Sequence, residues 1–372
     1  AEQFRWSERV AASRSRDGSR VRGYGVASAF HTAGSNGFDG LVRITPDGIL
    51  HVHTGVGNLG TYSYASTSRI AAEVLGYDWS RVVLEYGGTA RHLPWNLGQF
   101  GSNTNFTMTR TNWVAAMDAK AKLQEIAAAV LGGTPEDYEL RDERVVATAD
   151  ASKGISFAEA AQKAIEMGGK YSGQQLPEDI NPMTIASATA MAGSGLIGVA
   201  KDTLPKVGTV PALSASFVEV DVDVETGKVD IRECLTVADC GTVIHPMGLA
   251  AQVRSAAVMG FGLAHTERHI YDPAYGRPNA RALYLSKPYS ILDVPADGLH
   301  WAAVDQPDFE NPMGMKGIGE PIQGSASAAL ICAISDALGG HLFNRVPVVT
   351  DMIINAAEGM PQSHKPLATN TV

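Results

Sequence analysis

The sequence predicts an α+β fold of two lobes, and two β-hairpins with the helices that follow them are the observations that predict it. Pro46–Asp47–Gly48 lies between two alternating apolar runs, and Glu225–Thr226–Gly227 lies between two more. Turn residues flanked by runs of period two are typical of hairpins. Helical spacing of apolar residues follows each hairpin, so the two halves repeat one order of elements. We therefore expect a first lobe at 1–150, a connecting segment at 151–210 and a second lobe at 211–372.

Four of the five expected helices have a residue suited to their start or end, and the helix at 109–132 has apolar residues at three- and four-residue spacing. Gly76 and Gly132 suit the left-handed turn that ends a helix, Ser156 is a good N-cap, and Pro246 suits a first turn. The expected helices are 63–76, 109–132, 156–169, 246–264 and 325–338. Strands are expected over 40–55, 81–87 and 212–241, with a long polar loop over 87–107.

Composition excludes several classes of protein. The chain has 372 residues, 45% of them apolar and 19% charged, which is typical of a folded globular protein. A net charge of −9 disfavours nucleic acid and anionic membranes as partners. No apolar run reaches about 18 residues, so no membrane span is expected. Cys234, Cys240 and Cys332 form no CxxC pair, which disfavours a disulfide framework and a zinc or iron–sulfur site on this chain. The polar first residues are unlike a signal peptide, so we expect a cytoplasmic location, with the periplasm as the alternative.

Glu320 is the sharpest candidate for chemistry. It lies between Gly319 and Pro321, directly before the last expected helix. A carboxylate held rigidly in that setting can act as a general base. From the spacing alone, a surface glutamate that helps to cap the helix is the favoured alternative.

Two other clusters carry weaker signals. Asp239, Cys240 and His245 lie close enough in sequence for a metal site or a thiolate nucleophile, but a strand that ends in a turn is the favoured interpretation. His51 and His53 share one face of a strand. Because no third metal ligand lies near them in the sequence, a half-exposed strand face is the favoured interpretation there.

Two loops that open helices suit a polar or anionic ligand. The run GVGNLG at 55–60 precedes a helix, whose first N–H groups attract anions, although its spacing is not that of a dinucleotide fingerprint. The run GSNTNFTMTRTN at 101–112 offers Ser, Thr and Asn side chains to the polar atoms of a cofactor. A solvated loop is an equally open interpretation of the second run.

Motifs spread over nearly the whole chain indicate its family. They are RGYGVA (22–27), IAAEVLG (70–76), LGQFGSN (97–103), FVEVDVDVETGKV (217–229), VADCGTVIHPMGLAAQ (237–252), GFGLAHTE (260–267) and GMKGIGEP (314–321). In this order they resemble the molybdenum-binding subunit of the xanthine oxidase family of molybdenum hydroxylases, which includes aldehyde oxidoreductases. The family's subunit is usually much longer, and this chain resembles its C-terminal half.

The resemblance implies a cofactor and a set of site residues. It implies the two α/β lobes of that family's molybdenum-binding domain, with a molybdenum–molybdopterin cofactor, in its cytosine dinucleotide or shorter form, lying between lobes. It gives Glu320 the role of general base, and it implies that no side chain of this chain binds the metal directly. Phe30 is expected to flank the substrate, and His31 beside it to supply a proton. The residues expected to bind the cofactor are Gly60, Thr61, Gly101, Ser102, Asn103, Thr104 and Gly319.

Three features depart from the family's pattern. Gly60–Thr61–Tyr62 stands where Gly-Gln-Gly is usual, and Met259 stands where a second glutamine is usual. The loop that is rich in serine and arginine in relatives reads GSNTNFT here. We therefore expect backbone groups of Gly60, Gly101 and Ser102, rather than the usual side chains, to contact the cofactor.

The resemblance also implies an activity and partners. The expected activity is hydroxylation of an aromatic heterocycle or an aldehyde with oxygen from water. The expected partners are a chain carrying the N-terminal half of the subunit, an iron–sulfur subunit with [2Fe–2S] clusters and an FAD subunit. A molybdenum-dependent hydratase or reductive dehydroxylase is one alternative, which the altered loops and His31 favour. A non-catalytic half-subunit that completes a partner's fold is the other, and the intact motif around Glu320 argues against it.

Overall fold

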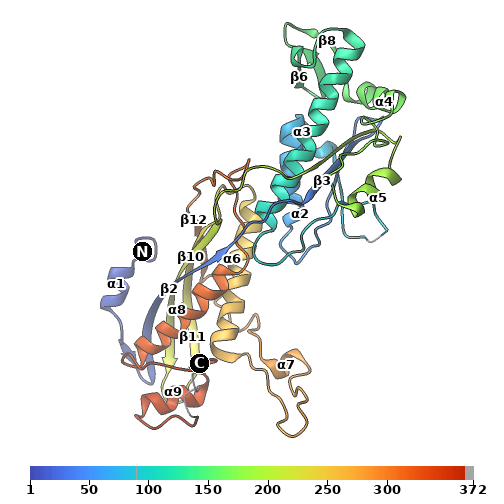
Figure 1. The fold of residues 1–372 in the computed structure, drawn as a ribbon. Helices are drawn as coiled ribbons and strands as arrows, with labels where there is room; N and C mark the ends of the chain where they lie inside the picture. The colour runs from blue at the N-terminus through green and yellow to red at the C-terminus, as the bar shows by residue number, and fades with distance from the viewer. Residues whose placement is uncertain (89, 365–372) are drawn as a thin grey trace.

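The computed structural model describes residues 1–88 and 90–364, which form two lobes in an elongated molecule (Figure 1). A four-stranded sheet in the order β5-β4-β3-β9 lies in the first lobe. A five-stranded sheet in the order β1-β2-β10-β11-β12 lies in the second. The mixture of helices and sheets agrees with the α+β fold that the hairpins and helical runs predict.

In the first lobe, two helices cover one sheet. The sheet strands are β3 (Asp39–Ile44), β4 (Leu50–His53), β5 (Val82–Glu85) and β9 (Leu196–Lys201), and the helices are α2 (Ser63–Leu75) and α3 (Thr104–Leu131). Helix α3 approaches the sheet closely, because a Cβ on Gly40 would lie 1.9 Å from the carbonyl oxygen of Thr111. At the end of this lobe lie a small sheet and one helix, β6 (Tyr138–Arg141), β7 (Arg144–Ala147), β8 (Asp150–Ser156) and α4 (Phe157–Met167). Helix α5 (Pro182–Ala190) lies beside β3 of the four-stranded sheet (Figure 1).

In the second lobe, helix α8 lies on the sheet and helix α6 packs on α8. The strands are β1 (Arg16–Asp17), β2 (Arg20–Thr32), β10 (Pro211–Asp223), β11 (Val229–Asp239) and β12 (Leu299–Ala303). The helices are α1 (Trp6–Ala11), α6 (Pro246–Phe261), α7 (Leu283–Ser286), α8 (Pro321–Ala337) and α9 (Thr350–Ala357). A Cβ on Gly23 or Gly25 would lie 2.1 or 2.0 Å from carbonyl oxygens of α8. The two glycines of the RGYGVA motif therefore let α8 lie against β2.

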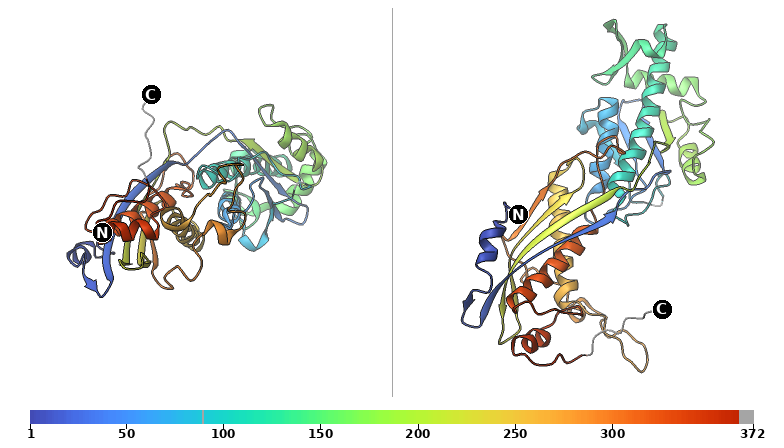
Figure 2. Two further views of the ribbon diagram at one scale, coloured as in Figure 1. Left: turned by 90° about the horizontal axis from the view of Figure 1, so that it is seen from below. Right: turned by 60° about the vertical axis from the view of Figure 1, so that its left-hand side comes forward.

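The sheets do not follow the expected division of the chain at 150 and 210. Strand β2 pairs with β10 over its whole length, so residues 20–32 belong to the sheet of the second lobe (Figure 2). Strand β9 lies within the expected connecting segment, yet it pairs with β3 of the first lobe. Alternating apolar residues predict that a segment is a strand, but they do not specify a partner far away in the sequence.

Several helices also begin earlier than expected or were not expected. Helix α3 begins at Thr104 rather than at 109, and α8 begins at Pro321 rather than at 325. In each case the first turn has one large buried apolar residue, Phe106 or Ile322, among polar or small ones, so it shows no clear apolar period. Helices α5 and α9 lie in segments for which no helix was expected. The predicted N-cap is found at Ser156, whose hydroxyl accepts from the N–H of Glu159 at 3.2 Å.

Arg110 of α3 links the two lobes. Its guanidinium is 1% exposed and pairs with Asp202 at 2.8 Å. It also donates to the carbonyl oxygens of Leu204, at 2.6 Å, and Glu310, which come from the segment between the lobes and from the second lobe. A buried cation surrounded by a carboxylate and carbonyl oxygens has its hydrogen-bonding needs met, so it fixes α3 against both segments.

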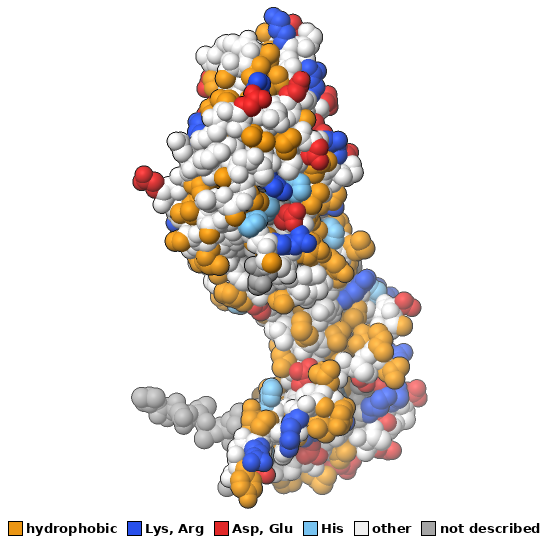
Figure 3. Space-filling model, turned by 90° about the vertical axis from the view of Figure 1, so that its right-hand side faces the viewer, with side chains coloured by type: hydrophobic (Ala, Val, Ile, Leu, Met, Phe, Trp, Pro, Cys, Tyr) orange, Lys and Arg blue, Asp and Glu red, His pale blue; other side chains and the backbone are white. Residues whose placement is uncertain are grey.

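One helical segment of the described residues, Pro246–Thr266, is long and apolar enough to cross a membrane by length and composition alone. It consists of α6 and a π-turn at Gly262–Thr266. A Cβ on Gly260 would lie 2.6 Å from the carbonyl oxygen of Gln323, so the segment packs directly on α8. Val253, Ala256 and Phe261 of this segment belong to the core of the second lobe, whereas Met247 and Met259 are exposed. On the face shown in Figure 3, Lys and Arg side chains are scattered among acidic and apolar ones.

Candidate active site between the lobes

Four helices begin around one cavity of about 420 Å³ at the junction of the lobes. Residues at the first turns of α2, α3, α6 and α8 line it: Ser63, Thr104, Gly248 and Gln323. The helix start at α6 is capped by His245, whose Nδ1 accepts from the N–H of Gly248 at 2.8 Å. No side chain of the N-cap residues Tyr62, Asn103 or Glu320 caps α2, α3 or α8.

This arrangement suits an anionic ligand. Uncapped N–H groups and the positive ends of helix dipoles favour negative charge. Among the described residues that line the cavity, Glu320 is the only one of the Asp, Glu, Lys and Arg type. Besides His245 and Cys240, the rest of the polar lining is made of hydroxyl and amide side chains, from Thr61, Ser63, Ser66, Gln99, Ser102, Thr104, Asn105, Thr242, Gln252, Ser255 and Gln323. Such groups bind a polar ligand through hydrogen bonds rather than through ion pairs.

Glu320 lies where the loop at 101–103 of the first lobe meets the GMKGIGEP segment of the second. Its Oε1 accepts from the N–H of Gly101 at 2.9 Å, and its Oε2 accepts from the hydroxyl of Ser102. The Ser102 hydroxyl in turn accepts from the N–H of Glu320 at 2.7 Å. The carboxylate therefore points to the other lobe and does not cap α8, the alternative that its position in the sequence had favoured.

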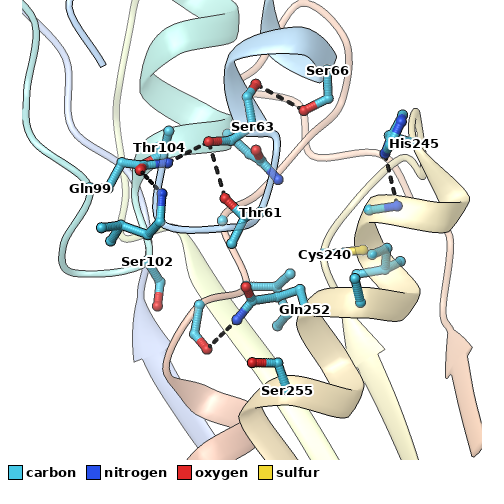
Figure 4. Close-up of a pocket in the computed structure, with 18 of the residues that line it drawn as sticks. Thr61, Ser63, Ser66, Gln99, Ser102, Thr104, Cys240, His245, Gln252 and Ser255 are labelled. Carbon is cyan, nitrogen blue, oxygen red and sulfur yellow. Dashed lines mark hydrogen bonds between the residues drawn. The ribbon is translucent and has the colours of Figure 1, made fainter. Parts of the chain in front are cut away.

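Two glutamines connect the walls of the cavity (Figure 4). The amide of Gln99 donates to the Ser63 hydroxyl at the start of α2, and its Oε1 accepts from the N–H of Leu59 at 2.9 Å. On the opposite wall, Gln252 of α6 donates to the carbonyl oxygen of Gly319 at 3.1 Å. Gln99 and Gln252 lie within family motifs, but neither is among the site residues expected from the sequence. The signal for Gln252 is its spacing, since Gly248, Gln252, Ser255 and Met259 all line the cavity from one face of α6.

The cofactor residues expected from the sequence fall into two groups. Five of them line the cavity: Gly60, Thr61, Ser102, Thr104 and Gly319. The other two do not: the N–H of Gly101 is engaged by Glu320, and Asn103 is buried, with its Oδ1 accepting from Thr107 at 3.1 Å. The N–H of Gly60 donates to Asn58 at 2.9 Å, so it is also engaged within the chain.

Phe30 and His31 lie on opposite faces of β2. His31 is near the site, because a Cβ on Gly101 would lie 4.0 Å from its Cε1. Its Nδ1 lies 2.7 Å from the carbonyl oxygen of Thr32. Phe30 is 65% exposed and does not line the cavity in this chain. The structure therefore brings His31, and not Phe30, close to the loop that holds Glu320.

The remaining singled-out residues have structural partners. Asp239 pairs with Lys316 at 2.7 Å, and burial raises the pKa of the Cys240 thiol to about 11, which leaves it protonated and unreactive near neutral pH. Burial lowers the pKa of His53 to about 4, and its Nδ1 lies 2.8 Å from the carbonyl oxygen of His92. His51 lies 3.2 Å from Glu85. In the described part of the chain, no three His, Cys, Asp or Glu side chains lie close enough together to hold a metal ion.

One protein-family model matches most of the chain. This model, described as a molybdopterin cofactor-binding domain, matches residues 1–295. The chain belongs to this family. Its relatives include a putative xanthine dehydrogenase molybdenum-binding subunit and an aldehyde oxidoreductase molybdenum-binding subunit, so the predicted membership in the xanthine oxidase family is confirmed.

Two curated relatives show how far the similarity to this molybdopterin-binding chain extends. The aldehyde oxidoreductase molybdenum-binding subunit PaoC of Escherichia coli K12 is 26% identical over 357 residues, which cover 95% of this chain and 43% of that protein. The nicotine 6-hydroxylase large subunit of Paenarthrobacter nicotinovorans is 24% identical over 91% of this chain and 38% of that protein. The chain thus spans less than half the length of these relatives.

Solved structures confirm the fold of this molybdopterin-binding chain. Quinoline 2-oxidoreductase from Pseudomonas putida 86 matches 97% of this chain with a TM-score of 0.73 and 24% identity, over 44% of its own length. The Cu,Mo carbon monoxide dehydrogenase matches 96% of this chain with a TM-score of 0.73 and 22% identity, over 43% of its own length. The predicted α+β fold of this family is therefore confirmed.

The cavity fits the phosphate and pterin groups of a molybdopterin. Three uncapped helix starts supply N–H donors for an anion, and hydroxyl and amide side chains supply partners for a heterocycle rich in nitrogen and oxygen. Glu320 lies on the wall of the same cavity.

Proposed function

We propose that this chain is the C-terminal half of the molybdenum-cofactor subunit of a multi-subunit oxidoreductase that hydroxylates an aromatic heterocycle or an aldehyde with oxygen from water. The observation that carries the proposal is Glu320, a carboxylate held by two hydrogen bonds on the wall of a cavity where four helices begin. Relatives named for aldehyde oxidation and nicotine hydroxylation support this choice of reaction class.

The residues of this chain would bind the cofactor and move one proton. Backbone N–H groups at the starts of α2 and α3, with the hydroxyls of Thr61 and Thr104, would hold its phosphate and pterin. When bound, the molybdenum cofactor supplies the redox chemistry and the oxygen that derives from water. Each carboxylate oxygen of Glu320 accepts one hydrogen bond from the 101–102 loop and keeps a second lone pair, where it can accept a proton as general base. His31, near Gly101, would hold or donate a proton to the substrate.

The rest of the relatives' length would close the cavity. Glu320 is exposed in this chain, and a general base works best where water is excluded. We propose that a polypeptide corresponding to the N-terminal half of the relatives covers this side, and that subunits with [2Fe–2S] clusters and FAD accept the electrons. We propose a cytoplasmic location for the complex, with the periplasm as the alternative, and a molybdopterin cofactor in its cytosine dinucleotide form or its shorter form.

The complex purified through this chain tests the proposal. Mass spectrometry would identify the partner chains and the pterin, and metal analysis would measure molybdenum per complex. We expect molybdenum, together with oxidation of heterocycles or aldehydes by a dye acceptor. Hydration of an enone without an acceptor would support the hydratase alternative instead, and a complex without molybdenum would support the non-catalytic half-subunit.

Thr61→Glu tests the anion-binding start of α2. The new carboxylate would occupy the uncapped N–H groups and repel the phosphate, so we expect molybdenum content to fall at least about tenfold. Thr61→Gln has nearly the same size without the charge and should keep most of the metal. Full molybdenum in the Glu variant, measured by mass spectrometry of the metal, would show that the cofactor does not approach α2.

A further inference from the structure

Ser102 and Glu320 form a reciprocal pair across the junction of the two lobes. The Ser102 hydroxyl donates to Oε2 of Glu320 and accepts from its backbone N–H at 2.7 Å. We propose that Ser102, although it lines the cavity, is a positioning residue: its hydroxyl is engaged by Glu320 and fixes the orientation of that carboxylate for proton transfer. This inference rests on the proposed function, because it gives Glu320 the role of base.

The loop that carries Ser102 is held in place from the other lobe. A Cβ on Gly317 would lie 1.2 Å from the carbonyl oxygen of Ser102, so the two backbones touch directly. A Cβ on Gly319 would lie 3.1 Å from the Ser102 hydroxyl oxygen. Ser102 is 8% exposed and adopts φ of 52°, a left-handed conformation that serine rarely takes. A strained residue that is packed this tightly presents its hydroxyl in one place.

Glu320 depends on this loop for its orientation. It is exposed, and its side chain makes no capping bond to α8. Both of the hydrogen bonds that its carboxylate accepts within the described chain come from residues 101 and 102. Without these two hydrogen bonds, the exposed side chain of Glu320 would sample several rotamers. Holding it in one rotamer costs conformational entropy, which the two hydrogen bonds must offset.

The same loop also leads into the cofactor cavity. Two residues after Ser102, Thr104 lines the cavity and begins α3. The segment 101–104 therefore determines both the orientation of the Glu320 carboxylate and the position at which α3 begins, next to the cavity. A base must be within hydrogen-bond reach of the proton that it takes, so an error in this segment would reduce turnover more than substrate binding.

Ser102→Ala and Ser102→Gly, made in the purified complex, test the inference. Both remove the hydroxyl, and glycine also relieves the strain at φ of 52°. Loss of a hydrogen bond to a charged group predicts a fall in kcat of about ten- to a hundredfold in both variants, with KM and molybdenum content close to the parent values. Hydrogen exchange of the peptide 317–324, measured on the same complex, should become faster because the N–H of Glu320 loses its acceptor.

The double variant with Glu320→Gln distinguishes positioning from an independent role. If Ser102 acts through Glu320, Ser102→Ala should not lower the residual turnover of Glu320→Gln any further. Ser156→Ala is a matched control, because Ser156 and Glu159 form a similar reciprocal pair at 2.7 and 3.2 Å, far from the cavity at the start of α4. It should lower the melting temperature and leave turnover unchanged.

Three results would overturn the inference alone: parent-like turnover of Ser102→Ala beside an inactive Glu320→Gln, loss of molybdenum from Ser102→Ala, or an additive effect in the double variant. The second of these would make Ser102 a cofactor ligand. A fully active Glu320→Gln variant would instead remove the proposed base, and with it both the proposed function and this inference.

Discussion

Glu320→Gln is expected to lower turnover at least about a hundredfold, the usual scale for the loss of a positioned general base. The glutamine keeps the size of the side chain and removes the proton acceptor. Its Oε1 can still accept from the N–H of Gly101, and its amide can donate to the Ser102 hydroxyl, which is able to accept as well as donate. We therefore expect the variant to fold and to retain molybdenum, which metal analysis of the purified complex would measure beside kcat.

Glu310→Gln is a suitable control for this substitution. Glu310 also accepts from backbone N–H groups, those of Val207 at 2.8 Å and Gly208 at 2.7 Å, but it does not line the cavity. Its turnover should stay within about twofold of the parent, as for substitutions away from the site. If Glu320→Gln turns over at nearly the parent rate with full metal content, another group is the base.

Local signals predicted the elements that depend on neighbouring residues. The turns at Pro46–Gly48 and Glu225–Gly227 join paired strands, and Ser156 caps its helix, because turn and cap geometry depends on a few consecutive residues. The pairing of β2 with β10 could not be predicted in this way. This pairing joins segments about 190 residues apart in the sequence. Gly23 and Gly25 are required because α8 lies directly against β2, and the local sequence does not show which helix lies there.

The candidate site shows the same difference between local and distant information. The family motifs pointed to Glu320, Thr61 and Thr104, which the structure brings to one cavity. They did not show that Ser102 holds Glu320, because residues 218 positions apart meet only when the lobes close on each other. Gln252 was overlooked because its role depends on which face of α6 is turned to the cavity.

Gly317→Ala is expected to open the junction between the lobes. The added Cβ would lie 1.2 Å from the carbonyl oxygen of Ser102, 2.4 Å from its carbonyl carbon and 3.2 Å from the nitrogen of Asn103. All three are backbone atoms, so no side chain can rotate away, and the 101–103 loop must move. Overpacking of this kind costs about 1–3 kcal/mol or more. Because the moved loop carries the partners of Glu320 and the start of α3, we expect turnover and molybdenum content to fall at least about a hundredfold, equivalent to roughly 3 kcal/mol.

Gly57→Ala separates this steric effect from a general effect of replacing glycine. A Cβ on Gly57 would meet no atom within 4 Å, and Gly57 does not have a left-handed φ, so the variant should keep its metal and its turnover. Molybdenum per complex, kcat and the melting temperature, measured side by side for both variants, check the prediction. Normal metal content and turnover in Gly317→Ala would show that the close contact between the backbones is not needed. Hydrogen exchange of the peptide 317–324 should become faster in Gly317→Ala and stay unchanged in Gly57→Ala. That result would show that the 101–103 loop has moved away from Glu320, as the clash with the new Cβ requires.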